Sequence, residues 1–573
     1  MDCREAAGPA PRKQALTSGS LTLKSRDTRK LRTIIVDLTP VLPGGENGGA
    51  KVFVLELLRR LAERAPQTEF VLLTQAAAHD ELAALDSTNV RRLMVLVADA
   101  PPVFRSLATR VFSRLLGHLP GRLRPIAERL GYSALVSMKR SGSRSLLRDL
   151  NADLLFCPFT APTYFEFGIP TVCVIYDLQY KTYPEFFARE DVVHRNRTFI
   201  EATRRSTALA AISDYSREMA ISVGKLDPAS IKTIHLHISQ HSLRNAPRDE
   251  SILSRLQLTA GRYLIYPANF WKHKNHEMLL TAFGLARHDG LAEDIRLVCT
   301  GAPGERQQWL QRSARALGLH NHVLFPGYLA TSELLALIAN SAGVVFPSLY
   351  EGFGLPVIEA MATGVPVACS NVTSLPEVAG DAAILFDPRI PEQIARAIVS
   401  LVHDKELAAR LIRLGDTQAA QFSDSRFMAE QYWELFQSAA GLEHRSNILV
   451  GVDQDGWAGP NATLQIVPCT QARMLDLEIA LPAGAPVQAI TLRIAHDQDQ
   501  KAEIIIERGE NKSVSVPLPL GGGYFNIHAS PSFVPSLTGG GNDNRELSVR
   551  FIRCDVASAD GQRDTLFGES STP

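Results

Sequence analysis

The residues whose types and spacing best fit chemistry lie in the segment 347–364, PSLYEGFGLPVIEAMATG. It follows a short apolar run, GVVF, and its glycines predict a tight loop that leads into a helix. Pro356 fits the first turn of that helix, and Gly364 fits its end. The amides of Gly354 and Leu355 would then be free at a helix N-terminus, which is an anion site suited to phosphate.

Two carboxylates frame this predicted helix. Glu351 lies before it and Glu359 lies about one turn inside it, so both can line one pocket. Phe353 belongs to the loop between Glu351 and the helix. A pair of glutamates at this spacing also occurs by chance, and the alternative interpretation is two surface carboxylates. The strand–loop–helix context favours the pocket.

The elements that must position these residues alternate along the chain from residue 31. Short apolar runs rich in β-branched residues alternate with helix-like stretches, and buried parallel strands read as continuous apolar runs. The segment 51–61 places its apolar residues on one helical face. The first set of predicted strands is 33–37, 70–73, 93–97, 153–156, 171–176 and 207–212.

A second set of strands follows the polar stretch 239–252. We therefore predict an α/β fold of two doubly wound domains, at 31–245 and 246–445. Ligands bind such sheets at the carboxyl ends of the strands, and the space between two such domains is the default site. The second set of predicted strands is 263–266, 295–299, 323–325, 343–346, 366–369 and 382–386.

The two ends of the chain differ from this pattern. Residues 1–30 are polar and without periodicity, which predicts a disordered tail. Helical periodicity stops near residue 447, and short alternating runs replace it, with triple glycines at 521–523 and 539–541. We predict a separate all-β module, an antiparallel β-sandwich, over residues 446–573.

Glu351 and Glu359, with GFGLP between them, resemble the E-x7-E motif of the retaining glycosyltransferases of family 4. Three further matches are YPANFWKHKNH at 266–276, GGAKVFVLELL at 48–58 and ISDYSR at 212–217. The resemblance implies the GT-B fold, in which an N-terminal acceptor domain and a C-terminal nucleotide-sugar donor domain face a cleft. The β-sandwich would be an added accessory module.

The resemblance also implies how the donor's diphosphate is held. Lys274 would neutralise it as a compact charge, and the loop amides at Phe353, Gly354 and Leu355 would cradle it. The glycine pair 48–49 would let the N-terminal domain approach the phosphates closely. From the residues alone, the less favoured alternatives are a solvated loop residue for the lysine and ordinary turn residues for the glycines.

Three carboxylates would contact the rest of the donor. Glu359 would accept a hydrogen bond from the ribose, and Glu351 would contact the transferred sugar and stabilise positive charge at its anomeric carbon. Asp177, which we also place among the catalytic residues, follows a predicted strand, and its alternative role is a helix N-cap.

Two positions depart from the family pattern. Tyr176 stands where many members have a histidine before the aspartate, and a tyrosine hydroxyl is not a base near neutral pH. Ala268 stands where an arginine is common, so Lys272 or His273 would have to supply that charge. Both departures keep a non-catalytic function open.

The sequence gives little sign of a metal or of a cofactor beyond the donor. The alternating histidines His235, His237 and His241 resemble a metal cluster, but such spacing on a strand is more often incidental. The glycine-rich stretch 44–51 lacks the Lys-Ser/Thr pair of an ATP-binding loop. The seven cysteines are dispersed and form no C-x-x-C pair, which argues against a zinc ribbon or a disulfide framework.

The charge distribution bears on partners and location. Sixty Lys and Arg balance sixty Asp and Glu, so no global charge indicates a nucleic-acid partner. The segment 101–148 is strongly basic, with Glu128 its one acid. It fits a basic amphipathic helix on an anionic membrane, and its alternatives are a solvated face or a diphosphate contact. We expect a cytoplasmic protein that contacts the inner membrane from one side.

The sequence thus predicts a retaining, metal-independent hexosyltransferase, with a weak preference for mannose. Its donor would be a nucleotide-diphosphate sugar, and its acceptor a glycan or a lipid-linked glycan in bacterial surface polysaccharide synthesis. Two alternatives remain, a non-catalytic GT-B scaffold that binds nucleotide sugar or glycan, and a nucleotide-sugar epimerase.

Overall fold

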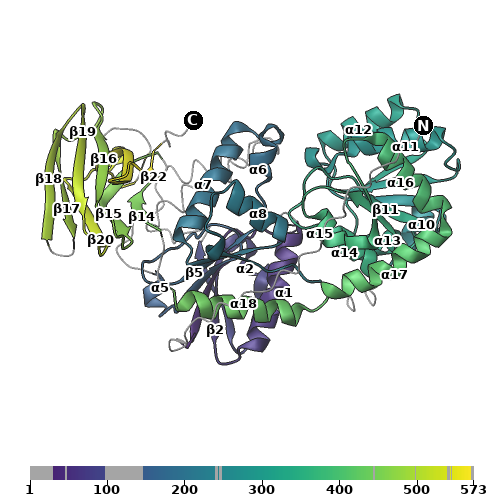
Figure 1. Ribbon diagram of the computed structural model, residues 1–573, viewed down its shortest axis with the longest axis horizontal. Helices are drawn as coiled ribbons and strands as arrows, with labels where there is room; N and C mark the ends of the chain where they lie inside the picture. The colour runs from purple at the N-terminus through teal and green to yellow at the C-terminus, as the bar shows by residue number, and fades with distance from the viewer. Residues whose placement is uncertain are drawn as a thin grey trace, which may run out of the picture.

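A computed structural model describes residues 30–44, 48–96, 146–238, 243, 248–442, 446–453, 455–496, 499–537, 543 and 545–568 (Figure 1). The predicted tail at 1–30 lies outside this part of the chain except for Lys30. The basic segment 101–148 also lies outside it, except for residues 146–148.

The first α/β domain contains a sheet of seven parallel strands in the order β3-β2-β1-β4-β5-β6-β7. Its strands are β1 Thr33–Asp37, β2 Glu69–Gln75, β3 Val90–Leu96, β4 Leu154–Cys157, β5 Thr171–Ile175, β6 Ala208–Ala211 and β7 Ile231–Thr233. Its helices are α1 Gly48–Arg64, α2 Ala76–His79, α5 Leu146–Asp149, α6 Gln179–Thr182, α7 Arg189–Arg205 and α8 Asp214–Ser222, with 3-10 turns η1 Glu81–Leu85, η3 Pro184–Phe186 and η4 Pro228–Ser230.

The physical cause of this sheet is the apolar character of its central strands. Strands β4, β5 and β6 are buried along their whole length, as expected when helices cover both faces of a parallel sheet. On α1, the predicted apolar face of Val54, Leu57, Leu58 and Leu61 is buried against the core. Strand β7 was not predicted, because its three residues, IKT, are too few to show an apolar run or an alternation.

The second α/β domain repeats the design with six parallel strands in the order β10-β9-β8-β11-β12-β13. Its strands are β8 Tyr263–Pro267, β9 Arg296–Thr300, β10 Val323–Gly327, β11 Gly343–Phe346, β12 Val367–Ser370 and β13 Ala383–Phe386. Its helices are α10 Ser251–Arg255, α11 His276–His288, α12 Glu305–Ala316, α13 Thr331–Ala339, α14 Leu355–Ala362, α15 Leu375–Ala379, α16 Pro391–His403 and α17 Lys405–Gln421, with η5 Lys272–Lys274 and η6 Gly380–Ala382.

One helix crosses back from the second domain to the first. Helix α18, Ser425–Ala440, lies in the range predicted for the second domain but packs against α1 of the first (Figure 1). Its Tyr432 ring lies 5.7 Å from Phe156 and 6.2 Å from Phe53. Glu430 pairs with Arg64 at the C-terminal end of α1. This helix therefore fastens the end of the second domain to the core of the first.

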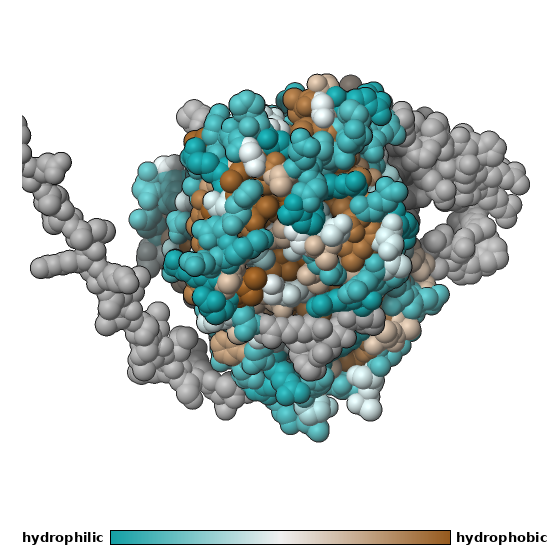
Figure 2. Space-filling model, turned by 90° about the vertical axis from the view of Figure 1, so that its right-hand side faces the viewer, coloured by the Kyte–Doolittle hydropathy of each residue, from teal (hydrophilic) through white to brown (hydrophobic). Residues whose placement is uncertain are grey.

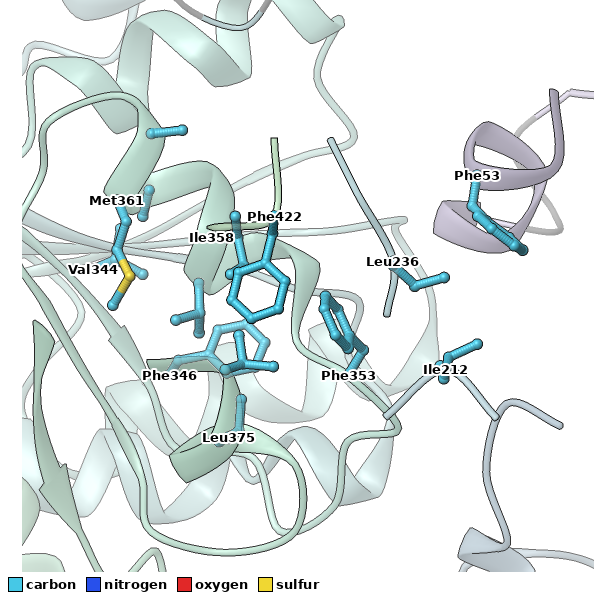
Figure 3. Close-up of a cluster of buried hydrophobic side chains, with 14 of the residues drawn as sticks. Phe53, Ile212, Leu236, Val344, Phe346, Phe353, Ile358, Met361, Leu375 and Phe422 are labelled. Atoms are coloured by element: carbon cyan, nitrogen blue, oxygen red, sulfur yellow. The ribbon is translucent and has the colours of Figure 1, made fainter. Parts of the chain in front are cut away.

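Apolar side chains from both domains meet at the seam between them. Phe353, from the loop before α14, lies between Leu236 and Ile212 of the first domain and Phe422 of the second (Figure 3). The Phe353 and Phe422 rings are 5.5 Å apart, and Phe353 is 3% exposed. The two domains therefore share one hydrophobic core, which fixes their orientation around the loop.

The C-terminal module is an antiparallel β-sandwich, as predicted. Its sheets have the orders β14-β15-β20-β17-β18 and β19-β16-β21-β22 and enclose a core of their own. Trp457 packs edge-on to Phe533 at 5.7 Å, so it belongs to the rim of this core. The strands are β14 Ile448–Val452, β15 Ala458–Ile466, β16 Arg473–Leu481, β17 Ala489–His496, β18 Asp499–Glu507, β19 Glu510–Leu518, β20 Gly523–Ser530, β21 Arg550–Ser558 and β22 Arg563–Phe567, with η7 Pro535–Leu537.

Within the described residues, the sandwich lies against the first α/β domain and away from the second (Figure 1). Arg204 of α7 bonds the Asp564 carboxylate at 3.1 Å, and the ring of Phe167 meets that of Tyr524 at 5.4 Å. On the far side of the molecule, the second domain presents a mostly hydrophilic face with small apolar groups between the polar residues (Figure 2). Among the described helices, none combines the length and the apolar character that crossing a bilayer requires.

Candidate active site

The predicted site residues gather where the strand order of each sheet reverses. In the first sheet the order reverses between β1 and β4, and α1 begins beyond β1 with the glycine pair 48–49. In the second sheet it reverses between β8 and β11, where Lys274 follows β8 and Glu351 follows β11. Such points open a crevice at the carboxyl ends of the strands, which is where α/β sheets bind ligands.

Lys274 and Glu351 form an ion pair at this point. The Lys274 ammonium lies 2.6 Å from Glu351 Oε1, and each side chain is only 12% exposed. The neighbouring Asn275 adopts a left-handed conformation and donates to the carbonyls of Pro347 and Pro388, at 3.1 and 2.8 Å. Asn275 thus ties the turn that carries the lysine to the loop that carries the glutamate.

Gly354 starts α14 in a conformation that requires glycine. Its φ is +116°, and a Cβ placed there would lie 2.7 Å from Leu375 Cδ2. The first amides of α14 have no partner within the helix, and the amides of Gly354 and Leu355 make no bond to any described residue. The structure therefore has the free helix N-terminus that the sequence predicted.

The N-terminus of α1 faces this loop from the first domain. A Cβ on Gly49 would lie 3.1 Å from Leu355 Cδ1, at the start of α14. Gly48 has a φ of +53°, which favours glycine at the first position of α1. Two helix N-termini, each with a partial positive charge, thus meet, and Lys274 is paired with Glu351 in the loop that leads into α14. This arrangement suits a ligand with more than one negative charge.

Glu359 is half-buried on α14 and its carboxylate accepts no hydrogen bond from any described residue. Burial raises the pKa of Glu359 above its usual value. A carboxylate held in this state gains from a ligand that donates a hydroxyl. Its position one turn inside the helix agrees with the role implied for it, contact with a sugar hydroxyl.

Asp177 lies on the same side of the seam, after β5. Its Oδ1 accepts the amide of Gln179, the first residue of α6, at 3.0 Å, but the N-cap position of that helix is Leu178. Burial raises the pKa of Asp177, and the charges of Arg195, Glu351 and Lys274 all act on it. The carboxylate therefore belongs to the same electrostatic cluster as the ion pair.

Three positions behave differently from the family pattern. The Tyr176 hydroxyl donates to the carbonyl of Pro158 at 2.8 Å and its ring packs on Phe53, so it points into the first domain. The Phe353 ring is in the core, so any contact with a ligand would go through its backbone. Burial, and then Lys274, lower the pKa of His273 to about 4, so His273 does not supply a positive charge near neutral pH.

Glu377 of α15 joins the two domains next to the site. Its carboxylate accepts the amides of Asp214 and Tyr215, at 2.8 and 3.1 Å, from the first turn of α8 in the first domain. His235 Nε2 lies 2.6 Å from Glu377 Oε1. These three contacts hold the second domain to the N-terminus of α8, where a carboxylate is electrostatically favoured.

Asp214, His235 and Glu377 also have the residue types of a metal site, and their ligand atoms lie within 4.8 Å of one another. A metal ion would have to replace the bonds that Glu377 already makes to two amides and a histidine. His237 faces Phe422 and Phe427 instead, and His241 lies outside the described residues. The arrangement is explained by the contact between domains.

Sequence reasoning missed three residues at this site. Glu377 bonds residues far away in the sequence, and Tyr350 accepts the amide of Leu178 across the seam at 3.3 Å. Arg195 of α7 stacks on Phe187 at 4.8 Å, and its charge acts on both Asp177 and His273. Tyr350 lies directly before Glu351 in the segment 347–364, so that segment could have drawn attention to it, whereas Glu377 and Arg195 lie in no local motif.

Comparison with known proteins locates the similarity in these α/β domains. Residues 251–417 match the family model of the glycosyl transferases group 1. O-antigen chain mannosyltransferase B of Escherichia coli is 31% identical over 279 residues, which are 48% of this chain and 72% of that protein. The serotype-specific mannosyltransferase WbdA of Escherichia coli is 28% identical over 283 residues, and the chain spans 34% of its length.

Solved structures show the same fold at low identity. Anabaena Alr3699/HepE, crystallised in complex with UDP and glucose, matches with a TM-score of 0.53 at 19% identity, over 71% of this chain and 100% of that one. Sucrose-phosphate synthase from Thermosynechococcus elongatus matches with a TM-score of 0.51 at 18% identity, over 71% and 98%. The predicted fold class, GT-B with an added β-sandwich, is confirmed.

Proposed function

Because the chain belongs to the glycosyl transferases group 1, we propose that it transfers a hexose from a nucleotide-diphosphate sugar to a glycan or lipid-linked acceptor. The relatives named as O-antigen and serotype-specific mannosyltransferases support mannose as the sugar and a bacterial surface polysaccharide as the product. We further propose that the reaction retains the anomeric configuration and needs no metal ion.

The observation that carries this proposal is the convergence of positive groups at one point. The Lys274 ammonium, the free amides of Gly354 and Leu355, and the N-terminus of α1 all lie at the seam. When the bond from the anomeric carbon to the diphosphate breaks, the electron pair stays on the diphosphate. Donors already fixed in place stabilise that charge without reorganisation, in the role that a divalent cation plays elsewhere.

The carboxylates act on the other half of the reaction. As the diphosphate leaves, positive charge develops at the anomeric carbon; the acceptor hydroxyl oxygen bonds to that carbon, and its proton passes to the departing diphosphate. Glu351 and Asp177 present oxygens that accept hydrogen bonds from sugar hydroxyls and stabilise this charge. Glu359 would accept a bond from the ribose. The ion pair of Lys274 with Glu351 holds the lysine in position before the diphosphate arrives.

A turnover assay tests the proposal. The full chain is incubated with a panel of nucleotide sugars and membrane-extracted acceptor, and the released nucleoside diphosphate is measured. We expect release with a GDP- or UDP-hexose, reduced at least 100-fold by Lys274→Met and by Glu351→Gln. Lys405→Met, a change to an exposed lysine at the start of α17, is the matched control and should leave the rate unchanged.

The two alternative functions give different results in the same assay. The orientation of Tyr176 into the first domain favours the scaffold alternative, for which binding without any turnover is the expected result. Conversion of the donor sugar without acceptor would instead indicate an epimerase. Acceptor-dependent release that Glu351→Gln abolishes excludes both.

A further inference from the structure

A groove on the first domain lies beside the candidate active site and has no role in the account above. It is formed between α6, α7 and the C-terminal end of α8, with a volume of about 390 Å³. The residues that define its character are Tyr180, Lys181, Val192, Val193, Asn196 and Val223.

The groove adjoins Asp177 through the short helix α6. Helix α6 begins two residues after Asp177, and Tyr180 lines the groove while its hydroxyl is influenced by the Asp177 charge. The Tyr180 hydroxyl and Gln179 Nε2 have no hydrogen-bond partner among the described residues, and both side chains belong to residues that are more than nine-tenths buried. Unsatisfied buried donors of this kind are rare in folded proteins and suit a site that a ligand completes.

The charge of the groove is positive. The Lys181 ammonium donates to Asn196 Oδ1 at 2.8 Å and lies over the rings of Tyr180 and Phe199. No described carboxylate lies within ion-pair distance of it, and the second positive group that acts on it is Lys225. A half-buried cation without a counter-ion is stabilised by any anion that enters.

The walls of the groove are apolar and open to solvent. Val193 is 52% exposed and Val223 is 44% exposed, on two different helices that border the same space. Valine side chains offer no hydrogen bonds to a sugar, so a plain glycan gains little from them. A hydrocarbon chain gains about 25 cal/mol for each Å² of apolar surface that it removes from water.

We propose that this groove binds the phosphorylated lipid end of the acceptor, an amphiphile with an anionic head and a hydrocarbon chain. The phosphate lies at Lys181 and Asn196, the chain runs along Val193 and Val223, and the acceptor sugar extends past Tyr180 toward Asp177. This inference rests on the proposed function, because it assigns the acceptor of the same reaction. It places the lipid on the domain that does not hold the donor.

A binding assay on the full chain tests the groove with decyl phosphate as the probe, below its micelle concentration. We expect Val193→Asp and Lys181→Gln each to weaken binding of decyl phosphate at least 10-fold. Leu317→Asp is the matched control, because Leu317 has the same 52% exposure on the second domain, and it should bind as the wild type does. Because Val193 is exposed, its replacement tests the groove even if Lys181→Gln does not fold.

Two further measurements separate this inference from the proposed function. Binding of UDP and GDP should be unchanged in Val193→Asp, since the donor site is elsewhere. If the wild type binds decyl phosphate but neither UDP nor GDP, that result counts against the donor site and not against the groove. Inorganic phosphate should bind at least 10-fold more weakly than decyl phosphate. Equal binding of decyl phosphate by wild type and Val193→Asp, or of the two probes by the wild type, would overturn the proposal.

Discussion

The contact of Glu377 with the first domain gives a quantitative prediction for the variant Glu377→Gln. In the wild type, one carboxylate accepts two amides and lies against His235, at 2.6–3.1 Å. Hydrogen bonds to a charged group contribute roughly 1.5–3 kcal/mol each, and less where solvent reaches them. The Glu377 side chain is 21% exposed, and glutamine keeps one acceptor oxygen. We therefore expect a loss of about 1–3 kcal/mol in closure of the two domains, or about 5- to 150-fold.

This loss should be visible in shape and in kinetics. Small-angle scattering of Glu377→Gln should give a larger radius of gyration, and the KM for the donor should rise, because α1 and α14 face each other in a smaller fraction of the molecules. Glu333→Gln is the matched control, since Glu333 accepts the amide of Ala330 within the second domain. Unchanged scattering and KM in Glu377→Gln would refute the reasoning that this carboxylate holds the domains together.

Three further predictions concern single residues. Gly354→Ala should lower the free energy of unfolding by about 2–5 kcal/mol, because the new side chain strains the backbone and meets Leu375. Gly364 has a φ of +77° but open space around it, so Gly364→Ala should lower the free energy of unfolding by less in the same denaturation experiment. Burial raises the pKa of Glu359, so the folded state binds the proton of this carboxyl group more tightly than the unfolded state does. The free energy of unfolding therefore falls as the pH rises above the unfolded pKa. In urea titrations, Glu359→Gln should be more stable than the wild type at pH 7 and equal to it well below pH 4. With a pKa of about 4, His273 is neutral above pH 6, so His273→Gln should leave the pH profile of donor binding between pH 6 and 8 unchanged, and a shifted profile would contradict its assigned burial.

Much of the α/β fold could be read from the sequence, because buried parallel strands are continuous apolar runs. GVVF at 343–346 was predicted with the bounds that β11 has, and other strands of the second sheet differ by one or two residues. The strands of the β-sandwich were harder to predict from the sequence. The alternating run ELSVRFI at 546–552 overlaps only the start of β21, which is Arg550–Ser558, and Pro460 and Asn461 interrupt the alternation within β15.

Some features of the candidate site could likewise be predicted from the sequence and others could not. The loop of Glu351 and Gly354 was readable, because glycines and a proline fix its local conformation before any tertiary contact forms. The orientation of Tyr176 and the burial of Phe353 depend on Phe53, Phe422 and Leu236, which come from distant parts of the chain. Such contacts leave no local pattern. The domain ranges and the role of each site residue stay predictions.

The central claim is that Lys274 and the start of α14 hold a diphosphate, and titration calorimetry of nucleoside diphosphates tests it most directly. UDP and GDP are titrated into the wild type, Lys274→Met and Lys405→Met. The account predicts that at least one of them binds the wild type and the Lys405 variant equally, and binds Lys274→Met at least 10-fold more weakly, a difference of about 1.4 kcal/mol or more. Equal affinity for wild type and Lys274→Met would contradict it.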